Sequence, residues 1–211
     1  MEIKRIPVGM IGTNCYIVYS GNECAVIDPG DEAERIALEI EKSGLEPKAI
    51  LLTHGHFDHI GAVNELRSRY RCKVIIGEKD NEMLTDMSKN LTPFKSAGKY
   101  IIDGAETVTD GDEINIGGIT FTVFETPGHS KGSVCYLAEQ NLFSGDTLFR
   151  QECGRTDLYG GNYSEIKKSL KRLSELDEAV KVYPGHGEES NIAHERRYNP
   201  YMGCADYDDI Y

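Results

Sequence analysis

Positive charge is scarce in this sequence. Its 211 residues include 23 lysine and arginine residues against 35 aspartate and glutamate residues, which gives a formal net charge of −12. A strongly acidic surface repels phosphate backbones, so we expect no nucleic-acid partner. The net charge sets no such limit on a small-molecule substrate, because a local basic pocket can persist within a negative field.

Long apolar runs and paired cysteine motifs are also absent. No stretch approaches the roughly 20 apolar residues that span a bilayer, so we expect no membrane partner. Residues 1–6 carry neither a long apolar segment nor a small-residue cleavage pattern, so we expect no signal peptide. The six cysteines are scattered without a Cys-x-x-Cys pair, which favours reduced thiols in a cytoplasmic protein.

The rest of the composition, 39% hydrophobic and 27% charged, is typical of a globular chain that buries a large core. No change in composition divides the chain, so we predict a single domain over residues 1–211. Apolar periodicity predicts two similar α/β halves, packed sheet against sheet with helices outside. Strands are predicted at residues 3–8, 15–19, 24–27, 49–53, 73–77, 106–109, 118–124, 134–137, 142–144 and 179–183.

Four helices are predicted from apolar stripes and start signals. The first is expected to begin at a capping box formed by Asp31 and Glu34. The second is expected to follow directly after His59, and a weaker helix is expected over residues 78–88. Ser164 is predicted to cap the fourth helix.

Histidine is rare as well, and half of it falls in one short stretch. Three of the six histidines lie in Thr53-His54-Gly55-His56-Phe57-Asp58-His59, directly after an apolar run typical of a buried strand. The carboxyl end of a strand is where active sites of layered α/β folds tend to lie. Three imidazoles and a carboxylate packed this closely suit zinc, iron or manganese. A polar loop with histidines by chance is the alternative, and their concentration argues against it.

Three further strand ends each carry a ligand-type residue. His129 follows Thr-Pro-Gly after one predicted strand, His186 follows Pro-Gly after another, and Asp146 follows Ser-Gly after a third. We expect all three to lie at the same edge of the sheets as the loop at residues 53–59. His194 lies among helix-forming residues and is expected to be a surface or packing histidine.

Taken in order, the motifs T-H-x-H-x-D-H, T-P-G-H-S, S-G-D-T-L-F and P-G-H-G resemble those of the metallo-β-lactamase-fold hydrolases. The resemblance implies an α+β fold, a four-layer αββα sandwich with the metal site at one edge of the sheets. Within that superfamily the chain is most similar to short bacterial members of the glyoxalase II branch, the hydroxyacylglutathione hydrolases, on the strength of residues 145–149, 153–157 and 195–200. Full-length members carry a C-terminal helical domain that contributes much of the glutathione site, and we expect that domain to be missing here.

The resemblance also implies two divalent metal ions, with zinc expected first and iron or manganese as alternatives. A water shared by two metals would ionise near neutral pH, and the resulting hydroxide would attack the carbonyl of a small-molecule thioester. Asp58 would also be catalytic, orienting the hydroxide or relaying a proton. The implied ligands are His54, His56 and His129 for one metal, Asp58, His59 and His186 for the second, and Asp146 bridging both.

Several neighbouring residues have two open interpretations. Arg155 could bind a substrate carboxylate or form an ion pair with Asp157. Tyr159, flanked by glycines, is a candidate for lining the substrate pocket. Asp28 could orient a ligand histidine from behind or could be a turn residue. Cys153 is expected to pack against the core or line the site rather than to react.

Other functions share parts of this pattern. The segment at residues 153–157 also resembles persulfide dioxygenases, which have the same fold but use a single iron and oxygen. A nuclease or phosphodiesterase is disfavoured by the acidic balance. A purely structural metal site is disfavoured because such sites are usually closed tetrahedra, whereas seven ligands leave room for a shared water.

Two segments lack a clear pattern. Residues 89–105 are predicted to form a long loop, of the kind that often borders an active site. The tail from Tyr198 could be a surface cover, a subunit contact or a disordered segment, and the oligomeric state is not fixed by the sequence.

Overall fold

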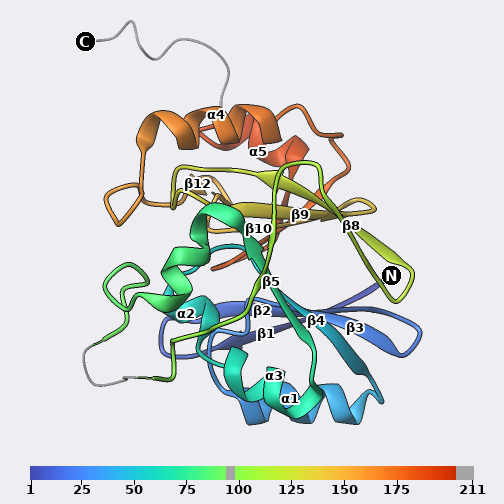
Figure 1. Cartoon of the computed structure of the whole chain (residues 1–211). Coiled ribbons are helices and arrows are strands. Elements are labelled where there is room, and N and C mark those ends of the chain that lie inside the picture. The colour runs from blue at the N-terminus through green and yellow to red at the C-terminus, as the bar shows by residue number, and fades with distance from the viewer. Residues whose placement is uncertain (94–97, 203–211) are drawn as a thin grey trace, which may run out of the picture.

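Two six-stranded sheets face each other, and helices cover their outer faces (Figure 1). This arrangement is seen in a computed structural model, which describes residues 1–93 and 98–202. The predicted four-layer sandwich of helix, sheet, sheet and helix is confirmed.

The first sheet holds the N-terminal half of the chain. Its first three strands form an antiparallel meander, so the predicted hairpin is confirmed, with Tyr16 opposite Ile27. Its last four strands are mutually parallel, which brings their carboxyl ends to one edge of the sheet. The strands in sheet order are β1 (Glu2–Val8), β2 (Thr13–Ser20), β3 (Glu23–Ile27), β4 (Glu46–Leu52), β5 (Lys73–Gly77) and β6 (Glu106–Val108).

The second sheet holds the C-terminal half and is mostly antiparallel, apart from the parallel pairing of β10 with β13. The sequence did not predict β7, β14 or a separate two-stranded sheet, because these strands are only two to four residues long, too short for an alternating pattern to identify them. The strands in sheet order are β14 (Ser190–Asn191), β13 (Lys181–Pro184), β10 (Asn141–Gly145), β9 (Val134–Ala138), β8 (Ile119–Glu125) and β7 (Glu113–Ile116). The small sheet pairs β11 (Leu148–Phe149) with β12 (Glu152–Cys153).

Apolar side chains fill three layers of core. Between the sheets, Tyr16 packs edge-on against Phe143 and Tyr183. Because side chains alternate along a strand, the neighbouring Ile17 points to the opposite face. That outer layer lies under α1 (Ala33–Lys42) and α3 (Val63–Tyr70), while α4 (Tyr163–Leu173) and α5 (Ile192–Tyr198) cover the second sheet (Figure 1).

The predicted start of the first helix is wrong. The residue before α1 is Glu32, whose backbone is left-handed with φ of 54° and whose side chain makes no capping hydrogen bond. Asp31 accepts hydrogen bonds from the Glu32 amide and from Lys99 instead, so no capping box forms with Glu34. The tertiary contact with Lys99, distant in sequence, could not be read from local spacing.

Three other helix predictions need correction. The chain after His59 is not one helix, because α2 (Phe57–Ile60) ends before α3 and the Ala62 amide donates to the carbonyl of Pro29. The weaker helix expected over residues 78–88 is present as a shorter 3₁₀ helix, η1 (Glu78–Thr85), which ends before Asp86. The cap of α4 is Asn162, whose side chain accepts from the Glu165 amide, and Ser164 lies inside the helix.

Parts of two predicted segments lie outside the described residues, namely residues 94–97 of the long loop and residues 203–211 of the tail. Within the described part of the chain, no helix has the length and apolar character needed to cross a bilayer.

Candidate metal centre

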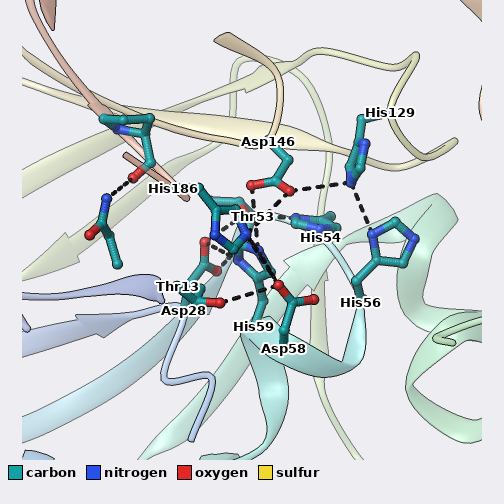
Figure 2. A network of polar contacts seen from close by, with 12 residues as sticks. Thr13, Asp28, Thr53, His54, His56, Asp58, His59, His129, Asp146 and His186 are labelled. Atoms are coloured by element: carbon teal, nitrogen blue, oxygen red, sulfur yellow. Dashed lines mark hydrogen bonds and ion pairs between the residues drawn. The ribbon is translucent and has the colours of Figure 1, made fainter. Parts of the chain in front are cut away.

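Seven histidine and aspartate side chains converge at one edge of the sandwich (Figure 2). Four of them follow β4 in the first sheet, and three follow strands of the second sheet. All seven are the residues that the sequence predicted as metal ligands. They are His54, His56, Asp58 and His59 after β4, His129 after β8, Asp146 after β10 and His186 after β13.

The loop after β4 is shaped by tight packing. A Cβ atom on Gly55 would lie 2.6 Å from the Cβ atom of Met83, so only glycine fits between the two histidines that flank it. The short helix α2 then begins at Phe57 and places Asp58 and His59 in one turn. A single loop therefore delivers four donor side chains.

One donor group consists of His54, His56 and His129. One nitrogen from each lies within 4.8 Å of the others, and all three side chains are buried. The Nδ1 atom of His56 lies 2.9 Å from Nε2 of His129. We call these three residues the first group.

Asp58, His59 and His186 form the second group, by the same distance criterion. The Nε2 atom of His186 lies 3.1 Å from Oδ2 of Asp58 and 3.3 Å from Nε2 of His59. Asp146 lies between the groups (Figure 2), with Oδ1 3.4 Å from Nε2 of His59 and Oδ2 3.6 Å from Nε2 of His129. This is the place that a bridging carboxylate would need.

Buried donor atoms without partners indicate that the centre suits a cation. Among the described residues, three buried side-chain atoms lack a hydrogen-bond partner, namely Nε2 of His54, Nε2 of His56 and Oδ1 of Asp146. A buried polar atom left unpaired costs about 1–3 kcal/mol of stability, so three together in one cluster call for an occupant. Imidazole nitrogens and carboxylate oxygens are donors that divalent transition metals accept.

The electrostatics of the centre favour the neutral forms of His54 and His56 in the first group. Burial lowers the pKa of His54 well below its usual value and lowers the pKa of His56 to about 3, and the neighbouring imidazoles add to both shifts. In the second group, burial disfavours the charged form of His59, but Asp146, Asp58 and Asp28 raise its pKa to about 10. A positive charge is thus favoured beside Asp58 and Asp146, where a metal ion would supply it.

Asp28 touches a predicted ligand directly. Its Oδ2 atom lies 3.0 Å from Nδ1 of His59 and accepts from the Thr53 hydroxyl at 2.7 Å, and its Oδ1 atom accepts from the Thr53 amide. An Nδ1 proton donated to Asp28 leaves Nε2 of His59 free to face the centre. The contact agrees with the orienting interpretation, and a left-handed φ of 48° makes Asp28 a turn residue as well.

Several supporting contacts were not predicted from the sequence. The main-chain carbonyl of Arg155 accepts from Nδ1 of His129 at 2.8 Å. Thr13 Oγ1 donates to Oδ2 of Asp58 at 3.2 Å. Asn14 and Tyr16 both donate to the carbonyl of Pro184, which holds the loop that ends in His186. No local motif marks these residues, because each partner is distant in sequence.

The side chains of the predicted substrate residues bond to partners outside the seven-residue cluster. Arg155 is exposed, and its guanidinium donates twice to Asp157 at 2.7 Å, so the ion pair that the sequence allowed does form. Tyr159 donates to Glu82 at 2.9 Å. Their roles in binding substrate stay predictions.

Two other expectations concern Cys153 and His194. Cys153 is half-buried, and burial raises the pKa of its thiol to about 11, which disfavours the reactive thiolate. His194 lies in α5 with Nε2 2.8 Å from the Gln151 side chain, outside the seven-residue cluster.

Comparison with known sequences gives one family. A profile described as "Metallo-beta-lactamase superfamily" matches residues 8–186. The chain is 39% identical to "Probable metallo-hydrolase YqgX" of Bacillus subtilis, with 96% of this chain and 98% of that protein covered. It is 31% identical to "Hydroxyacylglutathione hydrolase GloC" of Haemophilus influenzae, again with 96% and 98% covered.

Solved structures agree in fold. The B3 metallo-beta-lactamase BLEG-1 superposes with a TM-score of 0.89 at 39% identity, covering 95% of this chain and 99% of that one. TTHA1623, solved in a di-iron-bound form, gives 0.84 at 35% identity over 94% and 99%. ETHE1 from Myxococcus xanthus gives 0.79 at 29% identity over 95% and 84%. With its sandwich fold and its histidine and aspartate cluster, the chain belongs to the metallo-beta-lactamase superfamily.

Proposed function

We propose that the protein is a cytoplasmic binuclear metallohydrolase that cleaves a small-molecule thioester, in the manner of glyoxalase II. The observation that carries the proposal is the pair of adjacent donor groups with Asp146 within 3.6 Å of both, where three buried donor atoms are left unpaired. The full-length similarity to GloC, which is named a hydroxyacylglutathione hydrolase, supports the choice of substrate class.

Each donor group is assigned one divalent cation, zinc first, with iron or manganese as alternatives. His54, His56 and His129 would hold one ion, Asp58, His59 and His186 the other, and Asp146 both. When bound, two such cations would lower the pKa of a shared water and polarise the thioester carbonyl. The iron held by TTHA1623 is the reason to include iron among the metals tested.

Asp58 is assigned the role of orienting the nucleophile. Although burial disfavours its charged form, His59 and His186 hold the pKa of its carboxyl below the usual value. A carboxylate that resists protonation is suited to accepting a hydrogen bond and is a weak proton acceptor. Thr13 donates to Oδ2 of Asp58 and fixes its rotamer for this purpose.

A protein nucleophile is not needed for this chemistry. Within the described part of the chain, the half-buried Cys153 is the least buried cysteine, and its raised pKa opposes attack by the thiolate. Hydroxide formed from water is therefore the nucleophile in the proposed reaction.

Persulfide dioxygenase activity is the second candidate. Two observations favour it, namely the Cys-Gly-Arg-Thr-Asp segment at residues 153–157 and the similarity to ETHE1 along most of both chains. Such an enzyme would use iron to consume oxygen, whereas the proposed hydrolase would consume no oxygen with any of its candidate metals.

The decisive experiment is hydrolysis of S-D-lactoylglutathione, followed at the absorbance of the thioester, by protein loaded with zinc, iron or manganese. Rapid hydrolysis that a chelator abolishes would support the proposal. No hydrolysis by fully loaded protein, together with oxygen uptake on a glutathione persulfide, would favour the dioxygenase. A β-lactam substrate serves as a further control, because BLEG-1 is a β-lactamase.

A further inference from the structure

A second buried aspartate lies beside the ligand loop, on the side opposite Asp28. The strands β3, β4 and β5 are parallel neighbours, and the loop with four predicted ligands follows β4. Asp28 follows β3, and Asp80 follows β5 at the start of η1. The two carboxylates thus flank the ligand loop at the same edge of the sheet.

Asp80 is fully buried and accepts three hydrogen bonds from neutral donors. Its Oδ2 atom accepts from the Ser130 hydroxyl at 2.6 Å and from the Gly55 amide at 3.2 Å. Its Oδ1 atom accepts from the Gly132 amide at 2.7 Å. All three partners are donors, which is the pattern that an ionised carboxylate satisfies.

These donors belong to the two loops that carry the first group. Gly55 lies between His54 and His56 in the loop of the first sheet, and Ser130 directly follows His129 in the loop of the second sheet. One side chain therefore joins the two halves of the sandwich at the point where the first group is assembled.

We propose that Asp80 is a positioning residue that sets the spacing of His54, His56 and His129 for metal binding. Three imidazoles on two separate loops stay within reach of one ion only if the relative position of the two loops is fixed. Supporting contacts of this kind tune metal affinity by about 10–100-fold. This inference rests on the proposed metal centre and assigns its first group a support comparable to the one that Asp28 gives His59.

Replacement by asparagine keeps the size of Asp80, removes its negative charge and turns one of its two acceptor oxygens into a donor group. The asparagine amide can be placed in two orientations. In one, its NH₂ group faces the main-chain N–H of Gly55, and in the other it faces the main-chain N–H of Gly132. In both cases two hydrogen-bond donors face each other and repel. The Ser130 hydroxyl can reverse its own bond, but an amide N–H cannot. One of the two loops must therefore move away in Asp80→Asn.

The experiment measures zinc binding to the metal-free full chain in competition with a coloured chelator, with NMR of the histidine ring nitrogens to identify which imidazoles bind. For Asp80→Asn we expect the first group to lose about 10–100-fold in affinity, with a smaller change at the second group. Glu82→Gln is the matched control. Glu82 is exposed on the same helix, η1, and contacts Lys131 in the loop that also carries His129. That control should bind zinc like the unaltered chain.

The outcomes separate the two proposals. If the unaltered chain binds neither zinc nor iron nor manganese at the seven-residue cluster, the proposed function fails. If it binds two ions and Asp80→Asn binds them equally well, the positioning role is overturned. Should Asp80→Asn not fold by circular dichroism, Ser130→Ala decides instead, because it removes one donor and should lower first-group affinity about tenfold. Unchanged affinity in Ser130→Ala would then overturn the role.

Discussion

The two donor groups of the centre are built differently. The first group is three imidazoles supplied by both sheets, and its His129 side chain is only 4% exposed. The second group includes a carboxylate and is more open, with His186 at 24% and Asp58 at 16% exposure. The first group therefore resembles a site fixed inside the packing of the fold, while the second group is partly open to solvent.

Removing the residue that both groups share should have the largest effect. Asp146→Ala should reduce bound metal and lower kcat/KM for the thioester by about 10³-fold or more, because metal catalysis supplies several kcal/mol and each 1.4 kcal/mol is about tenfold in rate. Metal analysis and steady-state kinetics on the same sample test this. Full activity in Asp146→Ala would contradict the proposal that Asp146 binds both metal ions.

Asp58→Ala tests whether the groups are separable. The variant should lose the second metal first and retain about one metal ion per chain, since the first group keeps all three imidazoles. Elemental analysis after dialysis gives the stoichiometry. A variant that keeps two ions per chain would show that the division between the groups is drawn in the wrong place.

Asp28→Asn probes the support of the second group. An asparagine side chain has only one acceptor oxygen, so it cannot replace both oxygens of the Asp28 carboxylate in their three contacts with Thr53 and His59. The ring of His59 therefore loses its fixed orientation. We expect about 10–100-fold weaker binding at the second group with the first group less affected, the mirror of Asp80→Asn. Competition titrations with the two variants side by side measure this, and equal loss at both groups would mean that the centre responds as one unit.

Arg155→Ala should give the smallest change. Its ion pair with Asp157 is exposed to solvent and contributes little to stability, so the melting temperature should barely move. If Arg155 binds a substrate carboxylate, KM should rise roughly tenfold with kcat and metal content retained. Arg150→Ala is the matched control, an exposed arginine paired with Glu188, and an equal KM in both variants would end the substrate role of Arg155.

The clustering of the seven side chains could be predicted because each of them lies in a local motif. His129 and His186 each follow a Pro-Gly turn at the end of an apolar strand, and the loop at residues 53–59 is rich enough in donors to stand out alone. The sandwich followed from the same strands. These motifs mark histidine and aspartate side chains at the ends of strands. The side chains predicted from them do lie together in the structure.

The supporting residues could not be found in this way. Asp80 and Gly132 are separated by 52 positions, and the carbonyl that orients His129 belongs to Arg155, 26 positions away. Such contacts form only when the chain folds and brings distant segments together, so no local spacing in the sequence predicts them. The capping box at Asp31 failed for the same reason, since Lys99 competes for the carboxylate.

The supply of donors from both sheets has a thermodynamic consequence. Four donors belong to the N-terminal half and three to the C-terminal half, so a cation bound between them cross-links the halves without a covalent bond. Only the assembled sandwich can offer such a site, and free metal at 100 times the dissociation constant would add about 2.7 kcal/mol per site to the free energy of unfolding. The fraction of this chain that is folded would therefore depend on the concentration of free metal around it.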